Sequence, residues 1–290
     1  MHWVECTSSS LLGRWVARER ERVRIEADNR MRARMIECVK ETIDMNLTQV
    51  RKAFNEDGFV VLRDYLAPDL RDEIVDRTRR FISDVAPTID SKRGFFEDRN
   101  RPETMLRVEH LNLDDPWFAK LADAGPVREL AEHMLSAPVR STGVSVFGKS
   151  PRIGKLTPPH QDAFYWRITP KDALTVWIAI DRADEENGCV RYVPGSHLKE
   201  MQPHELSGVF GFSQHITDYD PGRVGEAVPA CVDPGELIVH HGMTIHYADP
   251  NESDRLRRAL GIVYYAEHVR DDESAPKFDP KKQWAKEGKL

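Results

Sequence analysis

The sequence predicts a mostly β fold, in which two antiparallel sheets pack against each other and helices flank them. Helix-forming segments fall before residue 135, and from Val139 onward short apolar runs are separated by turn residues. Pro194-Gly195 and Pro234-Gly235 are two of these turns. Helices first and many short strands afterwards are typical of a double sheet buttressed by helices.

Several elements are predicted before Val139. Asn46 or Thr48 can cap a helix that runs to Asn55. Pro68 suits the first turn of a helix that runs to Ile82, because the N–H that proline lacks would have no intrahelical partner there. The remaining segments are a strand at 59–63, a loop or flap at 84–103, a strand at 105–111 and a helix at 126–135.

From Val139 onward the apolar runs have the length of strands, and glycine, proline, asparagine and aspartate bound them. The predicted strands are 139–148, 160–166, 173–180, 189–193, 236–240, 243–247 and 257–265.

One large domain is expected between two appendages. Residues 1–45 form a charged extension, and its core at 14–40 contains no glycine or proline, which favours helix. Its apolar residues are irregularly spaced, so it is either a solvated segment or a helix that packs on a partner subunit in a homo-oligomer. The domain is placed at 46–270 and a polar C-terminal tail at 271–290.

The composition indicates a cytoplasmic protein. A net charge of −6 argues against nucleic acid as a general partner. No apolar run approaches the roughly 20 residues of a membrane span, and the N-terminus lacks the order of a signal peptide. The cysteines have no paired spacing and are expected to be reduced thiols: Cys6, Cys38, Cys189 and Cys231.

A candidate metal site begins with His160-Gln161-Asp162. Side chains alternate along a strand, so His160 and Asp162 should share one face. A second imidazole from a distant strand would complete the two-histidine, one-carboxylate face of a non-haem Fe(II) site. His246 is preferred for that role because a polar loop and then a new strand follow it. His240 and His241 are its rivals.

Arg257 stands eleven residues after His246, at the start of that new strand. It would alternate inward with Ala259 and Gly261, whose small side chains leave room for a ligand. A guanidinium can bind a carboxylate through two parallel hydrogen bonds, so this position suits an organic-acid co-substrate. Arg255 and Arg258 are the alternatives for this role.

Together these residues resemble the phytanoyl-CoA dioxygenase family of Fe(II)/2-oxoglutarate oxygenases, over about residues 46–268. Further motifs support the resemblance in the same order and spacing. They are Asp57-Gly58-Phe59-Val60-Val61, Trp177-Ile178-Ala179-Ile180-Asp181, Glu186-Asn187-Gly188-Cys189 and Pro194-Gly195-Ser196-His197.

The resemblance implies a double-stranded β-helix, a jelly-roll of the cupin-like type. It implies that His160, Asp162 and His246 hold Fe(II), with 2-oxoglutarate and O2 as co-substrates. Arg257 would bind the far carboxylate of 2-oxoglutarate, with Trp177 and Arg107 close by. The family often has serine two residues after the second histidine, where this chain has Ala248, so co-substrate binding is expected to be weaker. The metal-binding acid, which related halogenases lack, favours hydroxylation.

The expected reaction is hydroxylation of an unactivated C–H bond of a small organic molecule, with release of succinate and CO2. Cationic side chains favour an anionic or zwitterionic substrate such as a carboxylate or phosphonate: Lys149, Arg93, Lys155 and Arg167. An aromatic run could instead hold an alkyl chain, a ring or a quaternary ammonium: Phe164, Tyr165 and Trp166.

A flap from 84–103 or 203–222 would cover the substrate. Its aromatic residues are candidate contacts: Phe95, Phe96, Phe210, Phe212 and Tyr219. Two alternatives remain at this point. One is a metal-dependent hydrolase on a cupin-like barrel, since two histidines and an aspartate also suit zinc, and the other is a non-catalytic binding protein of the same fold.

Overall fold

The computed structural model describes residues 47–209 and 212–275. Contacts between Cα atoms divide the chain into two units, Met1–Val50 and Arg51–Leu290. The predicted extension at 1–45 lies outside the described residues, as does the predicted tail from 276 onward. No helix within the described ranges is long and apolar enough to cross a membrane.

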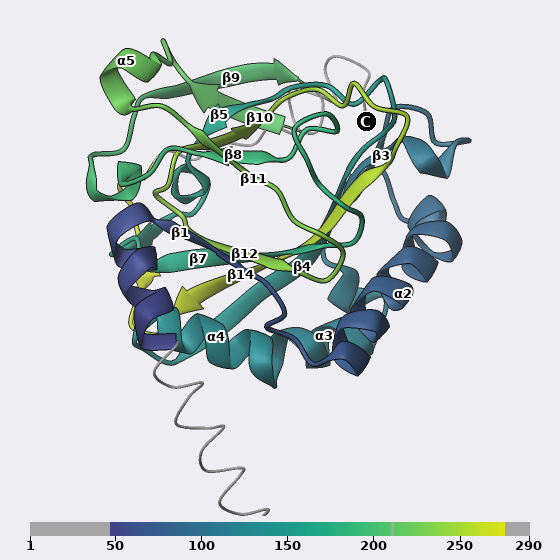
Figure 1. The fold of residues 1–290 in the computed structure, drawn as a ribbon, viewed down its shortest axis with the longest axis horizontal. Helices are drawn as coiled ribbons and strands as arrows, with labels where there is room; N and C mark the ends of the chain where they lie inside the picture. Colours follow the sequence, from purple (N-terminus) through teal and green to yellow (C-terminus); the bar gives the residue numbers. More distant parts are fainter. Residues whose placement is uncertain (1–46, 210–211, 276–290) are drawn as a thin grey trace, which may run out of the picture. The chain divides into compact units, whose positions relative to one another are not determined.

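The larger sheet has seven antiparallel strands and forms the floor of the domain (Figure 1). Every residue of its interior strand β7 is buried, because the sheet is covered on both faces. In order across the sheet, the strands are β1 (Phe59–Leu62), β12 (Leu237–His241), β7 (Ala173–Ala179), β14 (Arg257–Ala266), β4 (Val139–Lys149), β3 (Met105–Val108) and β2 (Gly94–Phe96).

A smaller, four-stranded sheet faces the larger one (Figure 1). Its strands, in order, are β11 (Val228–Ala230), β8 (Val190–Tyr192), β13 (His246–Ala248) and β5 (Thr157–His160). The hairpin of β9 (His204–Val209) and β10 (Phe212–Ile216) lies beside β5, and β6 (Ile168–Thr169) pairs with β15 (Arg270–Asp271).

Three helices cover the outer face of the larger sheet (Figure 1), and each begins with proline: α2 (Pro68–Asp84), α3 (Pro116–Asp123) and α4 (Pro126–Leu135). The Asp115 carboxylate caps α3 by accepting a 2.9 Å hydrogen bond from the Trp117 N–H. Ile74, Phe118 and Leu130 are fully buried on these helices. Their apolar faces therefore close the core on the side away from the smaller sheet.

The remaining helical segments are short. They are α5 (Pro221–Val224) and the 3-10 turns η1 (Ala86–Thr88), η2 (Pro102–Thr104), η3 (Leu111–Leu113), η4 (Asp162–Phe164) and η5 (Ser196–Leu198).

The predicted mostly β fold with flanking helices is confirmed, and residues 47–57 are helical, close to the predicted 46–55. Some boundaries were wrong. The predicted strand at 160–166 ends at His160 because the chain turns there into η4, and the Tyr165 N–H bonds to the Asp162 carbonyl. The predicted strand at 105–111 ends at Val108, because His110 takes a left-handed conformation with φ 57° and starts η3.

Candidate metal centre

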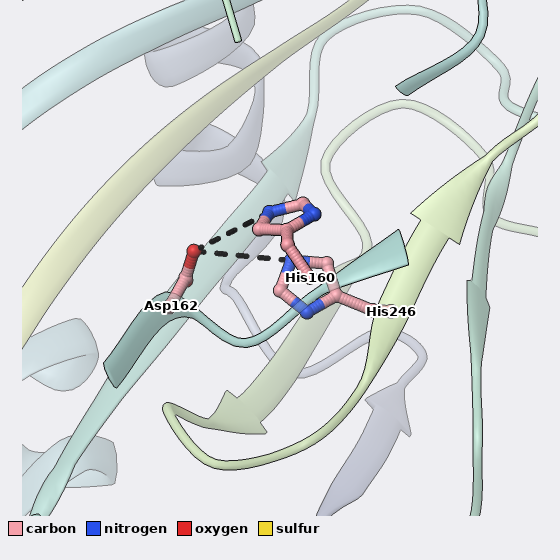
Figure 2. Close-up of side chains that lie close together, drawn as sticks. All are labelled: His160, Asp162 and His246. Atoms are coloured by element: carbon pink, nitrogen blue, oxygen red, sulfur yellow. Dashed lines mark ion pairs between the residues drawn. The ribbon is translucent and has the colours of Figure 1, made fainter. Parts of the chain in front are cut away.

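Three side chains from separate elements meet between the two sheets (Figure 2): His160 ends β5, Asp162 begins η4 and His246 begins β13. The histidines are direct partners across the β5–β13 ladder, and their ring centroids lie 4.2 Å apart. The three potential ligand atoms all lie within 4.8 Å of one another. This spacing is close enough for one metal ion to bind all three.

His160 and Asp162 lie close together as predicted, but they do not lie on one face of a strand. The turn after His160 brings Asp162 back toward the imidazoles. Its Oδ1 lies 3.6 Å from Nε2 of His160 and 3.9 Å from Nε2 of His246. A bond from the Ala163 N–H to the Gly242 carbonyl holds this turn against the loop after β12.

Backbone carbonyls fix the tautomer of both histidines. Nδ1 of His160 donates to the Pro158 carbonyl at 2.8 Å, and Nδ1 of His246 donates to the Thr244 carbonyl at 3.0 Å. Each Nε2 therefore keeps a free lone pair, as metal-binding histidines require. Burial, with the nearby His160 and His240, lowers the pKa of His246 well below its ordinary value. The imidazole is thus neutral at physiological pH.

The carboxylate of Asp162 is charged and oriented. Burial alone raises its pKa, but the neighbouring imidazoles of His160, His240 and His246 together hold the pKa well below the ordinary value. Its Oδ2 accepts hydrogen bonds from Oγ1 of Thr175 at 3.0 Å and from Nε2 of His240 at 3.2 Å. This leaves Oδ1 to face His160 and His246.

His240 is not one of the three clustered donors and instead bonds to the carboxylate of Asp162. Its Nδ1 lies 3.0 Å from the Tyr192 hydroxyl, and across the β12–β7 ladder it pairs with Thr175. His241, the other rival, points away toward Phe54 and His197. The roles of Thr175 and Tyr192 were missed from the sequence, because neither belongs to a motif and both reach the site through strand pairing.

Replacing Thr175 with valine should lower Fe(II) affinity by roughly 10-fold or more, in the range of losses seen when residues that orient metal ligands are changed. The substitution keeps the shape of the side chain and removes one hydrogen bond to Asp162. Anaerobic Fe(II) titration measures the change. Thr142→Val on β4, whose hydroxyl bonds only to the Val263 carbonyl, is the matched control. Equal affinities in the two variants would contradict the role of Thr175.

The metal donors share one cavity with Arg257 and Trp177. It measures about 600 Å³, counting the space at its open mouth. Most of its wall is apolar or uncharged. The lining residues are Phe147, Gly148, Thr157, His160, Asp162, Thr175, Trp177, Val190, Tyr192, His240, His246, Tyr247, Ala248 and Arg257.

Arg257 is a buried cation without a protein counter-ion. Only 4% of it is exposed, its Nε has no hydrogen-bond partner, and no acidic side chain in the described ranges lies within ion-pair distance. Burial lowers its pKa to about 10, so it remains charged at neutral pH. Its Cζ lies 5.8 Å from the centre of the Trp177 ring. A buried, unpaired charge is costly, so the site fits an anionic group such as a carboxylate.

The alternatives to Arg257 are bound elsewhere. Arg255 pairs with Asp184 and Glu186, and Arg258 forms a 2.6 Å ion pair with Asp181. The space beside Gly261 is not open to a ligand, because a Cβ there would lie 2.7 Å from the Phe147 ring.

Arg107 and Lys149 approach the cavity without lining it. Arg107 pairs with Glu109 at 3.1 Å and lies over the Phe147 ring at 5.2 Å. Lys149 is the strand partner of Arg257, but its ammonium donates to the Lys155 and Ala248 carbonyls. Burial, with Arg257 nearby, lowers its pKa well below the ordinary value.

The predicted substrate aromatics are dispersed. Tyr165 is 37% exposed and its ring centroid lies 6.2 Å from that of His160, which places it beside the metal site. Phe164 stacks on His204 of the β9–β10 hairpin, whereas Trp166 packs in a separate apolar cluster against Tyr265.

The aromatic residues predicted to lie on a flap over the substrate are also found in different parts of the fold. Phe95 and Phe96 are buried on β2, and Tyr219 contacts Tyr247 of the cavity wall. Phe210 lies outside the described residues, as does the side chain of Phe212.

Comparisons with known proteins agree with this site. Residues 54–259 match the phytanoyl-CoA dioxygenase (PhyH) family. The chain is 26% identical over 290 residues to the Caenorhabditis briggsae homolog of phytanoyl-CoA dioxygenase domain-containing protein 1, covering 84% of this chain and 95% of that protein. It is 25% identical over 240 residues to human peroxisomal phytanoyl-CoA dioxygenase, covering 77% and 70%.

Solved structures share the fold. The alpha ketoglutarate-dependent epimerase SnoN from nogalamycin biosynthesis superposes with a TM-score of 0.63 at 24% identity, covering 82% of this chain and 93% of that one. EctD from S. alaskensis, solved with 2-oxoglutarate and 5-hydroxyectoine, gives a TM-score of 0.63 at 20% identity, covering 75% of each chain. The predicted double-stranded β-helix is confirmed, although the two sheets do not close into a barrel.

The family match covers most of the described domain and includes His160, Asp162, His246 and Arg257. It sets aside the hydrolase and the non-catalytic alternatives. The chain belongs to the phytanoyl-CoA dioxygenase family and is a non-haem iron, 2-oxoglutarate-dependent oxygenase.

Proposed function

We propose that the chain hydroxylates an unactivated C–H bond of a small organic molecule, converting 2-oxoglutarate and O2 to succinate and CO2 as the second oxygen atom enters the substrate. The observation that carries the proposal is the placement of the metal donors and Arg257 in one cavity. The donor set alone would suit other metals, and Arg257 alone would suit any small anion. Their combination suits an acid that chelates the metal at one end and binds a guanidinium at the other.

The residues of the site have separate tasks. His160 and His246 present neutral Nε2 atoms, and Asp162 presents a charged, oriented oxygen. Iron, when bound there, supplies the activation of O2 coupled to decarboxylation of 2-oxoglutarate. Arg257 holds the far carboxylate of that acid, and the Trp177 ring provides an apolar wall close to the guanidinium. Asp162 fills the metal position that a halogenase would leave open, which supports hydroxylation.

The four cations that the sequence singles out bear on the charge of the substrate. The sequence favours an anion, but each of the four cations has protein partners within the described ranges. Arg93 pairs with Asp114, Lys155 pairs with Glu97, Arg167 donates to the Ala275 carbonyl, and Lys149 donates to the Ala248 carbonyl. Because an anion would have to displace these partners, our proposal favours an uncharged, partly apolar substrate over a carboxylate or phosphonate.

Succinate release tests this preference. Pairs of compounds that differ only in an alcohol or a carboxylate should be compared at equal concentration with the iron-loaded protein and 2-oxoglutarate. We expect the uncharged member of the active pair to stimulate succinate release more strongly. Stronger stimulation of succinate release by the carboxylate members would contradict this preference and favour an anionic substrate.

Co-substrate binding tests the reaction class itself. Anaerobic addition of 2-oxoglutarate to the Fe(II)-loaded protein should produce the weak visible charge-transfer band of the chelate. No band in a protein with confirmed iron loading would contradict the proposed function.

A further inference from the structure

Four side chains that line the cavity carry hydroxyl groups: Thr157, Thr175, Tyr192 and Tyr247. Thr175 is bound to Asp162, and Tyr192 is bound to His240. Tyr247 packs against Tyr219, with ring centroids 5.7 Å apart. The Thr157 hydroxyl makes no hydrogen bond with the described residues, and its oxygen is not fully enclosed by protein.

Thr157 is largely buried and lines the cavity, so its hydroxyl is placed to bind a ligand there. It is the first residue of β5, and only 8% of it is exposed. A hydroxyl that lines a cavity and has no protein partner is free to bond to water or to a ligand in that cavity. The cavity is the space to which Thr157 is open, and Arg257 lines the same cavity.

Strand pairing places Thr157 beside a position that cannot contribute a hydrogen bond. Thr157 is the partner of Ala248 across the β5–β13 ladder, and directly opposed side chains lie on the same face of a sheet. Ala248 also lines the cavity and offers only a methyl group. Thr157 is thus the hydroxyl donor available on this part of the wall.

We infer that the Thr157 hydroxyl donates a hydrogen bond to the far carboxylate of 2-oxoglutarate, the same carboxylate that Arg257 binds. An ionised carboxylate has about four acceptor sites, so two bonds from a guanidinium leave room for a third donor. The inference rests on the proposed function and adds a second determinant of co-substrate affinity.

The test compares Thr157→Val with Thr157→Ser. Valine removes the hydroxyl and keeps the shape, so the dissociation constant for 2-oxoglutarate should rise about 10-fold or more, as expected for a lost hydrogen bond to a charged group. Serine keeps the hydroxyl and should bind within about threefold of wild type. Binding is measured without turnover, by anaerobic titration of the chelate band and by calorimetry with Mn(II) in place of Fe(II).

A ligand without the far carboxylate tests whether Thr157 contacts that group. 2-Oxopentanoate has the same chain length but lacks the far carboxylate, so its affinity should not change in Thr157→Val. Ala248→Ser, which offers a hydroxyl from the opposite strand, should recover part of the lost 2-oxoglutarate affinity in the double variant.

Three results would overturn the inference: unchanged 2-oxoglutarate affinity in Thr157→Val, equal losses in valine and serine variants, or equal losses for both ligands. A wild-type protein that fails to bind 2-oxoglutarate would instead overturn the proposed function, and the role of Thr157 with it.

Discussion

Replacing Asp162 with alanine is expected to lower Fe(II) affinity by at least about 100-fold and to abolish succinate formation. The substitution removes the one anionic donor and leaves two neutral imidazoles, His160 and His246. It also leaves Nε2 of His240 and the Thr175 hydroxyl without their partner in a buried site. Iron content after anaerobic loading and desalting measures the effect directly.

Asp172→Ala is the matched control. Asp172 also pairs with an imidazole, that of His268 at 2.7 Å, but both side chains are about half exposed and lie outside the cavity lining. This variant should bind iron like wild type and lose no more than about 1 kcal/mol of stability. A folded Asp162→Ala protein that retains full iron content would show that the ligand set is wrong.

The chemistry of the site was more predictable than its geometry. The types and spacing of His160, Asp162, His246 and Arg257 identified the residues that meet in the structure, because a metal site needs particular donor atoms whatever backbone presents them. The predicted strand alternation of His160 and Asp162 was wrong, since β5 ends at His160 and a turn presents Asp162. A two-residue spacing is compatible with both conformations.

Partners distant in sequence could not be predicted. Arg93 was expected to meet a substrate, but Asp114 binds it through both carboxylate oxygens at 2.8 Å. Cys189 and Cys231 have no paired spacing, yet β8 and β11 bring their sulfurs to 3.9 Å as free thiols. The role of His240 likewise depends on how β12 pairs with β7. The tertiary fold decides each of these contacts, and strand pairing decides the last two. A single sequence does not state which segments pair.

Replacing Arg257 with methionine is expected to move binding and stability in opposite directions. Loss of the charge-assisted contact should weaken 2-oxoglutarate binding by on the order of 2–5 kcal/mol, or about 30- to 5,000-fold. The protein without ligand should become more stable, by on the order of 1 kcal/mol, because an unpaired buried cation is exchanged for an apolar side chain of similar length. Urea unfolding and anaerobic 2-oxoglutarate titration measure the two effects.

Substitution of the neighbouring Arg258 is expected to differ in its effects on stability and on 2-oxoglutarate binding. Arg258→Met breaks the ion pair with Asp181, whose carboxylate also accepts the Arg258 backbone N–H. It should therefore reduce stability and leave 2-oxoglutarate affinity unchanged, because Arg258 does not line the metal cavity. If Arg257→Met were destabilising to a similar extent and still bound 2-oxoglutarate normally, Arg257 would be a structural residue. The two substitutions are therefore expected to change stability in opposite directions. This difference distinguishes Arg257, whose counter-ion would be a ligand, from Arg258, whose counter-ion is the protein's own Asp181.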